Sequence, residues 1–215
     1  MADPAPVLVD PEVSRAKLAR QLQYWDAERE EWDRRGYFIT HREDLRVTVA
    51  FAARVVMQPG LQAIPLVLVN SEIDFANYDL WAPSVTMVEF LSRTPTIPPI
   101  PIQQVSNGQP VNVLLTDHPI SRLPFLCLRG IREYHSHPQH SGDDWLLYRG
   151  TGHGTLVTIC DAIWKYSTRR VGGLGFNAIS HPILGVQVQP ILIYNFDELA
   201  SVPMGASTSG AQGAA

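Results

Sequence analysis

The first strong pattern along the chain is helical. Within residues 11–35, apolar side chains recur near helical spacing among charged ones, Pro11 suits a first turn, and Gly36 suits a helix end. We therefore expect an amphipathic helix over residues 11–35. The charged run DAEREEWDRR in its second half is typical of a solvent-exposed helix face carrying ion pairs between successive turns.

The pattern then changes to β-branched and apolar residues. Residues 46–56 and 64–73 predict two strands, and the turn signal Gln58-Pro59-Gly60 between them predicts a hairpin. Residues 85–90 predict a third strand, and residues 111–115 a short fourth. One helix followed by strands, with a further helix after them, indicates an α+β fold with an antiparallel meander sheet.

That further helix is expected over residues 155–166. Thr155 is suited to cap its first turn, and apolar residues follow at helical spacing. The spacing turns Cys160 toward the core, where a small buried thiol acts as a hydrophobic side chain. The residues of the apolar face are Leu156, Ile159, Cys160, Ile163 and Trp164.

Other segments carry weaker signals. Residues 93–110 contain five prolines, which exclude a helix and a central strand and indicate a loop or an extended insertion. Residues 171–176 are rich in glycine, and residues 183–194 suit a strand pair or an extended packing segment. The secondary structure of the last fifty residues is therefore left unassigned by the sequence.

Length and composition suggest one globular domain. The chain has 215 residues, of which 45% are hydrophobic and 18% charged, enough to bury a large core without disulfides or metals. We expect a flexible segment over residues 1–10, the domain over 11–200, and a disordered tail of small residues over 201–215.

Charge and cysteine content exclude several classes of function. The net charge is −4, so we expect no nucleic-acid partner, because binding a phosphate backbone requires a concentrated positive face. Two cysteines are too few for a disulfide framework, and no apolar run approaches the length of a membrane helix. With no signal-peptide pattern either, we expect a cytoplasmic protein that does not bind membranes.

Most of the candidate chemistry lies between His118 and Trp145, a stretch with four of the seven histidines. Cys127 sits in the apolar tetrad Phe125-Leu126-Cys127-Leu128, which is typical of a buried structural thiol. The arginines close to it in sequence could instead favour a reactive thiolate. Those arginines are Arg122, Arg129 and Arg132.

The order of motifs resembles that of the ubiquitin-conjugating enzymes. His118-Pro119, Cys127-Leu128, Trp145 and a following helix correspond to that family's HPN motif, catalytic Cys-Leu, Trp and helix. The segment from Tyr78 to Met87 is similar to the family's YPFKPPKVTF segment and keeps Tyr, the second Pro, Val and Thr in register. The resemblance covers roughly residues 11 to 166.

The resemblance implies a bacterial member of that family with Cys127 as the catalytic thiol. Such an enzyme receives a ubiquitin-like modifier from an activating enzyme as a thioester and transfers it to an amine, without a metal or other cofactor. A JAMM-type deconjugating enzyme would be a further partner. His118, Pro119 and Trp145 would then be structural residues of the site loop.

The chain departs from the family at the position after Pro119, where Ile120 replaces the Asn that helps to stabilise the oxyanion. Another hydrogen-bond donor must then do this work. The histidines of the insertion before Trp145 are the densest group of donors near Cys127 in sequence, so we expect them to contribute to catalysis. They are His135, His137 and His140.

The same histidines support a different interpretation. His135-Ser136-His137-Pro138 resembles the HSHP core of JAMM-type zinc metallopeptidases, but Leu146 and Arg149 stand where that family has its later Ser and its Asp ligand. A different metal site, such as a zinc site, remains open. Its ligands would come from His135, His137, His140, Asp143 and Asp144.

A third class of function is also compatible with the sequence. Ile120 in place of the asparagine is also expected in an inactive conjugating-enzyme-like domain that acts only as a binding module. The sequence does not identify the modifier, the target or the oligomeric state.

Overall fold

The computed structural model describes residues 8–56, 62–181 and 185–194. The turn expected at Gln58-Pro59-Gly60, the tail expected over 201–215 and most of the N-terminal segment 1–10 therefore lie outside the described residues.

The expected N-terminal helix is present but divided at Glu28. Helix α1 spans Pro11–Ala27 and α2 spans Arg29–Arg35. Asp10 caps α1 by accepting a hydrogen bond from the backbone N–H of Glu12, and Gly36 ends α2 with a φ of 98°, a conformation that glycine adopts without strain.

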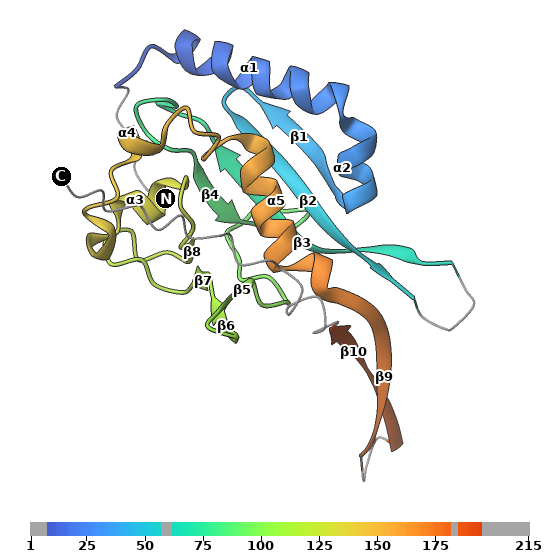
Figure 1. Cartoon of the computed structure of the whole chain (residues 1–215). Helices are drawn as coiled ribbons and strands as arrows, with labels where there is room; N and C mark the ends of the chain where they lie inside the picture. Colours follow the sequence, from blue (N-terminus) through green and yellow to red (C-terminus); the bar gives the residue numbers. More distant parts are fainter. Residues whose placement is uncertain (1–7, 57–61, 182–184, 195–215) are drawn as a thin grey trace, which may run out of the picture.

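A four-stranded antiparallel sheet follows, in the order β1-β2-β3-β4 (Figure 1). The hairpin and the third strand expected from the sequence are confirmed, although the third strand ends at Met87 rather than residue 90. The first strand of the sheet was not expected, because its exposed half carries Thr, His and charged side chains. The strands are β1 Tyr37–Glu43, β2 Arg46–Val55, β3 Ile64–Asp74 and β4 Ser84–Met87.

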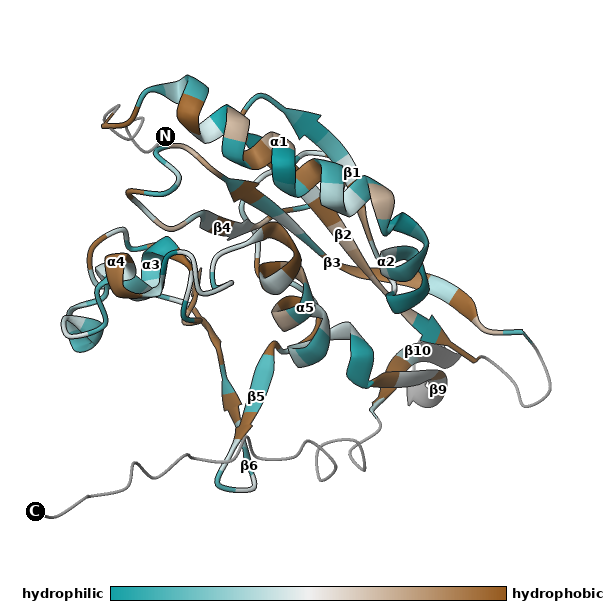
Figure 2. Cartoon of the chain, turned by 45° about the horizontal axis from the view of Figure 1, so that its top comes forward, coloured by the Kyte–Doolittle hydropathy of each residue, from teal (hydrophilic) through white to brown (hydrophobic). Residues whose placement is uncertain are grey.

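The second major helix, α5 at Leu156–Tyr166, matches the expected helix closely. Thr155 and Thr158 form a reciprocal capping box at its first turn. Helices α1 and α5 share one apolar core with the sheet, and along both helices apolar and polar residues alternate (Figure 2). The mixture of helices with antiparallel sheets is an α+β architecture.

The proline-rich insertion, expected to be a loop or an extended insertion, contains a small hairpin. Strands β5 Gln103–Ser106 and β6 Gln109–Asn112 pair through Asn107 and Gly108, whose φ angles of 52° and 74° suit a tight hairpin turn. The expected strand over 111–115 is split, because its second half forms β7 at Leu114–Leu115 and pairs with β8 at Phe125–Leu126.

Short helices fold the histidine-rich segment, and a long hairpin follows α5. These helices are α3 Arg132–Ser136, η1 Pro138–His140 and α4 Trp145–Tyr148, with η2 Thr168–Arg170 after α5. Strands β9 Val171–His181 and β10 Gly185–Tyr194 then pair antiparallel, extending from the body of the domain (Figure 1). Among the described residues, no helix combines the length and apolar character needed to cross a membrane.

Cys160 lies on α5 with no exposed surface, as the helical spacing indicates. Burial raises the pKa of its thiol well above the ordinary value, so this cysteine stays protonated and unreactive. We expect Cys160→Ala to lower the free energy of unfolding by about 1 kcal/mol through lost packing. Urea unfolding of the parent and the variant measures this difference, and a Cys160→Ala variant that keeps its stability but loses the reactivity of Cys127 would contradict a purely structural role.

Candidate functional site

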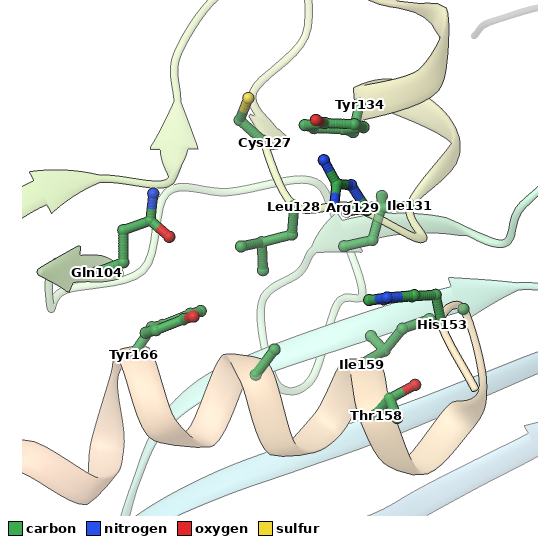
Figure 3. Close-up of a pocket in the computed structure, with 12 residues that line it drawn as sticks. Gln104, Cys127, Leu128, Arg129, Ile131, Tyr134, His153, Thr158, Ile159 and Tyr166 are labelled. Atoms are coloured by element: carbon green, nitrogen blue, oxygen red, sulfur yellow. The ribbon is translucent and has the colours of Figure 1, made fainter. Parts of the chain in front are cut away.

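Cys127 follows β8 and lines a cleft of about 480 Å³ between its own segment and α5 (Figure 3). Its backbone N–H donates to the carbonyl of Val113 at 2.7 Å, which fixes the segment beside β7. The residue is half-buried, so its sulfur is reachable from the cleft. The other lining residues are Gln104, Leu128, Arg129, Ile131, Tyr134, His153, Gly154, Thr158, Ile159, Ala162 and Tyr166.

The neighbouring arginines do not favour a thiolate, which corrects the expectation from the sequence. Arg129 pairs with Asp143 at 3.0 Å, and Arg132 donates to the backbone carbonyls of Ala82 and Ala76. Arg122 pairs with Asp117 at 3.7 Å. Burial instead raises the pKa of the Cys127 thiol. A reactive Cys127 therefore needs a nearby base.

His140 stands in the place of such a base. Its Nε2 lies 3.3 Å from the Cys127 Sγ, and its ring stacks on Tyr134 with centroids 3.9 Å apart and planes 16° apart. Its backbone N–H donates to the His137 carbonyl at 2.9 Å, within η1. A thiol and an imidazole at this distance form the nucleophile and base arrangement of cysteine catalysis.

Asp143 holds the tyrosine on which His140 stacks. Its carboxylate accepts hydrogen bonds from the hydroxyls of Tyr134 and Tyr148 and from the guanidinium of Arg129. These donors lower the pKa of Asp143 to about 2. The carboxylate thereby fixes the orientation of the Tyr134 ring, and through that ring the position of His140.

His135 is committed to the backbone at both ring nitrogens. Its Nε2 accepts from the Gly130 N–H at 3.1 Å, so its Nδ1 carries the proton and donates to the Asp143 carbonyl at 2.6 Å. Burial lowers the pKa of this imidazole, which keeps it neutral. His135 therefore ties the Cys127 segment to the loop before α4, and we no longer expect it to donate to an oxyanion.

His118 is similarly engaged. It is buried, its Nδ1 accepts from the N–H groups of Ile120 and Ser121, and its Nε2 lies 3.0 Å from the Glu133 carbonyl, to which it donates. It thus holds the turn after Pro119 against α3. His137 stacks on Phe125 and has a partner at Nδ1, the Gln139 N–H.

Trp145 and two glycines close the site against the start of α5. The Trp145 indole donates to the Asp79 carbonyl at 3.0 Å. A Cβ on Gly130 would lie 2.6 Å from the Gly154 nitrogen, and one on Gly154 would lie 2.7 Å from the Trp145 ring. Both glycines have positive φ, so this close approach admits no other residue without strain.

The five residues of the alternative metal site point to different partners. His135 and Asp143 are bound as described above, and Asp144 caps α4 by accepting from the Leu146 N–H at 2.9 Å. His140 faces the Cys127 sulfur and His137 faces Phe125. In the described part of the chain, no three side chains of the ligating types converge on one point.

A second cavity, of about 710 Å³, opens beyond the site. His140 lines this cavity but not the Cys127 cleft, whereas Tyr134 lines the cleft but not this cavity. Its walls combine apolar residues with acids and hydroxyls. They include Leu80, Trp81, Ile120, Leu146, Glu133, Ser136, Ser141, Asp143 and Asp144.

Two further residues of the site were not expected from the sequence. Gln104 reaches the cleft from β5 (Figure 3), and Tyr134 on α3 stacks against the His140 ring. Gln104 carried no signal because it lies in the proline-rich insertion. Tyr134 precedes the histidines directly, and only the short helix α3 turns it under His140.

The low pKa of Asp143 predicts a pH limit for the site. Its pKa falls from 3.8 to about 2 in the folded protein. The stability that the ionised carboxylate contributes is therefore fully present above pH 3.8 and is lost as the pH falls toward about 2. We expect the near-ultraviolet tyrosine circular dichroism to hold down to about pH 4 and to change below it. Asp143→Asn should lack this transition; an unchanged transition in that variant would assign it to another group.

Comparison with known sequences places the chain among related proteins. The Y4jH-like family (Y4jH family) matches residues 9–110 and 96–171. A protein of Sinorhizobium fredii (strain NBRC 101917 / NGR234), described as uncharacterized protein y4jH, is 37% identical in an alignment of 179 residues, and the match covers 74% of this chain and 84% of that protein. The matched range of the family includes the whole segment from β1 to α5 and therefore Cys127 and His140.

Proposed function

The chain belongs to the Y4jH family, and we propose that it transfers an acyl group in the manner of ubiquitin-conjugating enzymes, with Cys127 carrying a ubiquitin-like modifier as a thioester. The observation that carries this proposal is the 3.3 Å contact between the Cys127 Sγ and His140 at the edge of an open cleft. An activating enzyme would supply the modifier, and an amine would receive it.

The order of elements supports the proposal. An N-terminal helix, a four-stranded antiparallel meander, an extended segment with the cysteine and a helix across the core follow one another as in the conjugating enzymes. The His-Pro turn precedes the cysteine and is held by His118, which binds backbone groups on both sides. A fold similar to that family is part of the proposal. Beyond α5, the hairpin of β9 and β10 is a departure, because the family has helices there.

The chemistry begins with removal of the thiol proton. His140 accepts this proton through Nε2, and the Cys127 thiolate attacks the carbonyl carbon of the incoming thioester. The tetrahedral intermediate collapses, the carrier's thiolate leaves with the proton from His140, and the acyl group remains on Cys127. An amine then attacks the same carbon, Cys127 leaves as a thiolate, and the amine's surplus proton returns to the His140–Cys127 pair.

Oxyanion stabilisation must come from residues other than Ile120. The protonated His140 is one donor beside the sulfur, and the side-chain amide of Gln104, which lines the Cys127 cleft, is a second. Gln104 would supply from β5 the side-chain amide that the family has after its His-Pro pair, where this chain has Ile120. This assignment gives the proline-rich insertion a role, since it places β5 at the cleft.

The function is tested by acylation of Cys127, which should form an adduct that an added thiol removes by exchange. The probe is a synthetic peptide ending in Gly-Gly as a mercaptoethanesulfonate thioester, which needs neither the activating enzyme nor the natural modifier. An acylated Cys127 that transfers to free lysine supports the proposal. A protein that stays unmodified, or reacts no faster than glutathione, would favour a binding module without activity.

A further inference from the structure

A third cavity, of about 700 Å³, lies where α2, β2, η2 and β9 meet, and we call it the arginine cavity. Guanidinium groups from three separate elements line it: Arg34 and Arg35 from α2, Arg54 from β2 and Arg169 from η2. The remaining lining residues are Glu31, Ala52, Trp164, Thr168, Val171 and Gly172.

The arginine cavity is separate from the Cys127 cleft. Trp164 lines the arginine cavity, and Tyr166, two residues further along α5, lines the Cys127 cleft. Residues two apart in a helix point to nearly opposite sides, so α5 stands between the two cavities. The chemistry proposed at Cys127 therefore does not use these arginines.

Among the described residues, Arg34, Arg35 and Arg54 of the arginine cavity outnumber the two carboxylates that pair with them. Arg34 and Arg35 pair with Glu31, and Arg35 also pairs with Asp161 at 2.6 Å, so the two acids are matched by two arginines. Arg169 lies over the Trp164 ring at 5.1 Å. Arg54 is exposed and has no ion-pair partner among the described residues. A chain with a net charge of −4 thus places an arginine without a carboxylate partner among the described residues at this cavity.

A buried hydroxyl at the arginine cavity also lacks a partner. Thr168 is 1% exposed, and its Oγ1 has no hydrogen-bond partner within the described residues. Leaving a buried hydroxyl unsatisfied is costly, and such a group calls for an explanation, such as a bound molecule. Thr168 lines the same cavity as the arginines, so one anionic ligand there would pair with an arginine and accept a hydrogen bond from the Thr168 hydroxyl.

We propose that the arginine cavity binds a phosphate group. The guanidinium fork matches phosphate oxygens in pairs, and all the cationic lining residues are arginines rather than lysines. The Thr168 hydroxyl donates to a phosphate oxygen, while Arg54 supplies charge from the β2 side. The phosphate can be free or part of a nucleotide, because both present the same group to these residues.

Thermal unfolding of the full chain in sodium phosphate tests the site, with sodium chloride at equal ionic strength as the reference for screening. We expect phosphate to raise Tm in a saturable way, since a ligand of the native state stabilises it by mass action. Arg54→Gln should weaken the phosphate Kd about tenfold or more. Arg20→Gln removes the same charge from an exposed position of α1 and should respond like the parent.

Thr168→Val separates a ligand-binding role from a structural one. Valine has nearly the same shape and no hydroxyl, so the variant should melt at a higher temperature than the parent without phosphate and gain less from added phosphate. Calorimetric titration with ATP then shows whether the bound phosphate belongs to a nucleotide. A much lower Kd for ATP than for inorganic phosphate indicates a nucleotide, and an equal Kd indicates a lone phosphate. Phosphate no better than chloride, or Arg54→Gln and Thr168→Val both responding like the parent, would overturn the proposal.

Discussion

Cys127→Ala is expected to abolish acylation by the Gly-Gly peptide thioester, while Cys160→Ala retains it. The Cys127 sulfur opens on the cleft beside an imidazole, whereas Cys160 has no exposed surface. Intact-mass spectrometry should find one acyl group on the parent protein, and a reducing thiol should remove it. Cys127→Ser should form an oxygen ester, more slowly, and that adduct should survive the reducing thiol.

The two cysteine variants control for each other, because each retains one thiol. Circular dichroism before the reaction establishes that both are folded. Acylation that persists in Cys127→Ala and disappears in Cys160→Ala would reverse the assignment of the functional thiol. Acylation at the rate of a free thiol in all folded variants would mean that the cleft contributes nothing.

His140→Ala is expected to slow discharge of the acyl group from Cys127 to lysine by about a hundred- to a thousandfold, the usual cost of losing one oxyanion donor. Loading of Cys127 should slow as well, since the half-buried thiol loses the base 3.3 Å from its sulfur. Single-turnover measurement of loading and discharge separates the two effects.

His137→Ala is the matched control, because its ring stacks on Phe125 and its Nδ1 has a backbone partner. It should discharge at nearly the parent rate. His135→Ala should lower stability, since it removes the bridge between Gly130 and Asp143. Equal slowing in His137→Ala and His140→Ala would indicate a general disturbance of the loop rather than a specific role of His140.

The sequence predicts the elements whose signals are local. The capping residue Thr155, the helix end at Gly36 and the two long apolar strands each depend on neighbours within a few positions. These signals suffice for the helical character of residues 11–35, for α5 and for strands β2 and β3, but not for β1 or for the division of the first helix at Glu28. The hairpin of β5 and β6 was missed because five prolines outweighed its tight turn at Asn107 and Gly108.

The candidate site is harder to predict, because contacts across the chain determine the role of each histidine. The three histidines lie close together in the sequence, but their contacts in the folded segment differ. His135 hydrogen-bonds to the backbone, His137 stacks on Phe125, and His140 contacts the Cys127 sulfur. Charge has the same limitation. The arginines near Cys127 in sequence pair elsewhere, while Arg35, Arg54 and Arg169, far apart in sequence, line one cavity.

The two cavities that adjoin the Cys127–His140 pair bear on the order of events in the proposed catalytic cycle. Cys127 opens on the cleft over α5, and His140 opens on the cavity beside Trp81 and Leu146. If an enzyme has a single entrance, the spent carrier must depart before the acceptor can enter, and the two compete for one space. With two entrances, the acceptor can bind in one cavity while the carrier is still bound in the other. A high acceptor concentration then need not inhibit loading of Cys127. The labile thioester also spends less time exposed to hydrolysis before transfer.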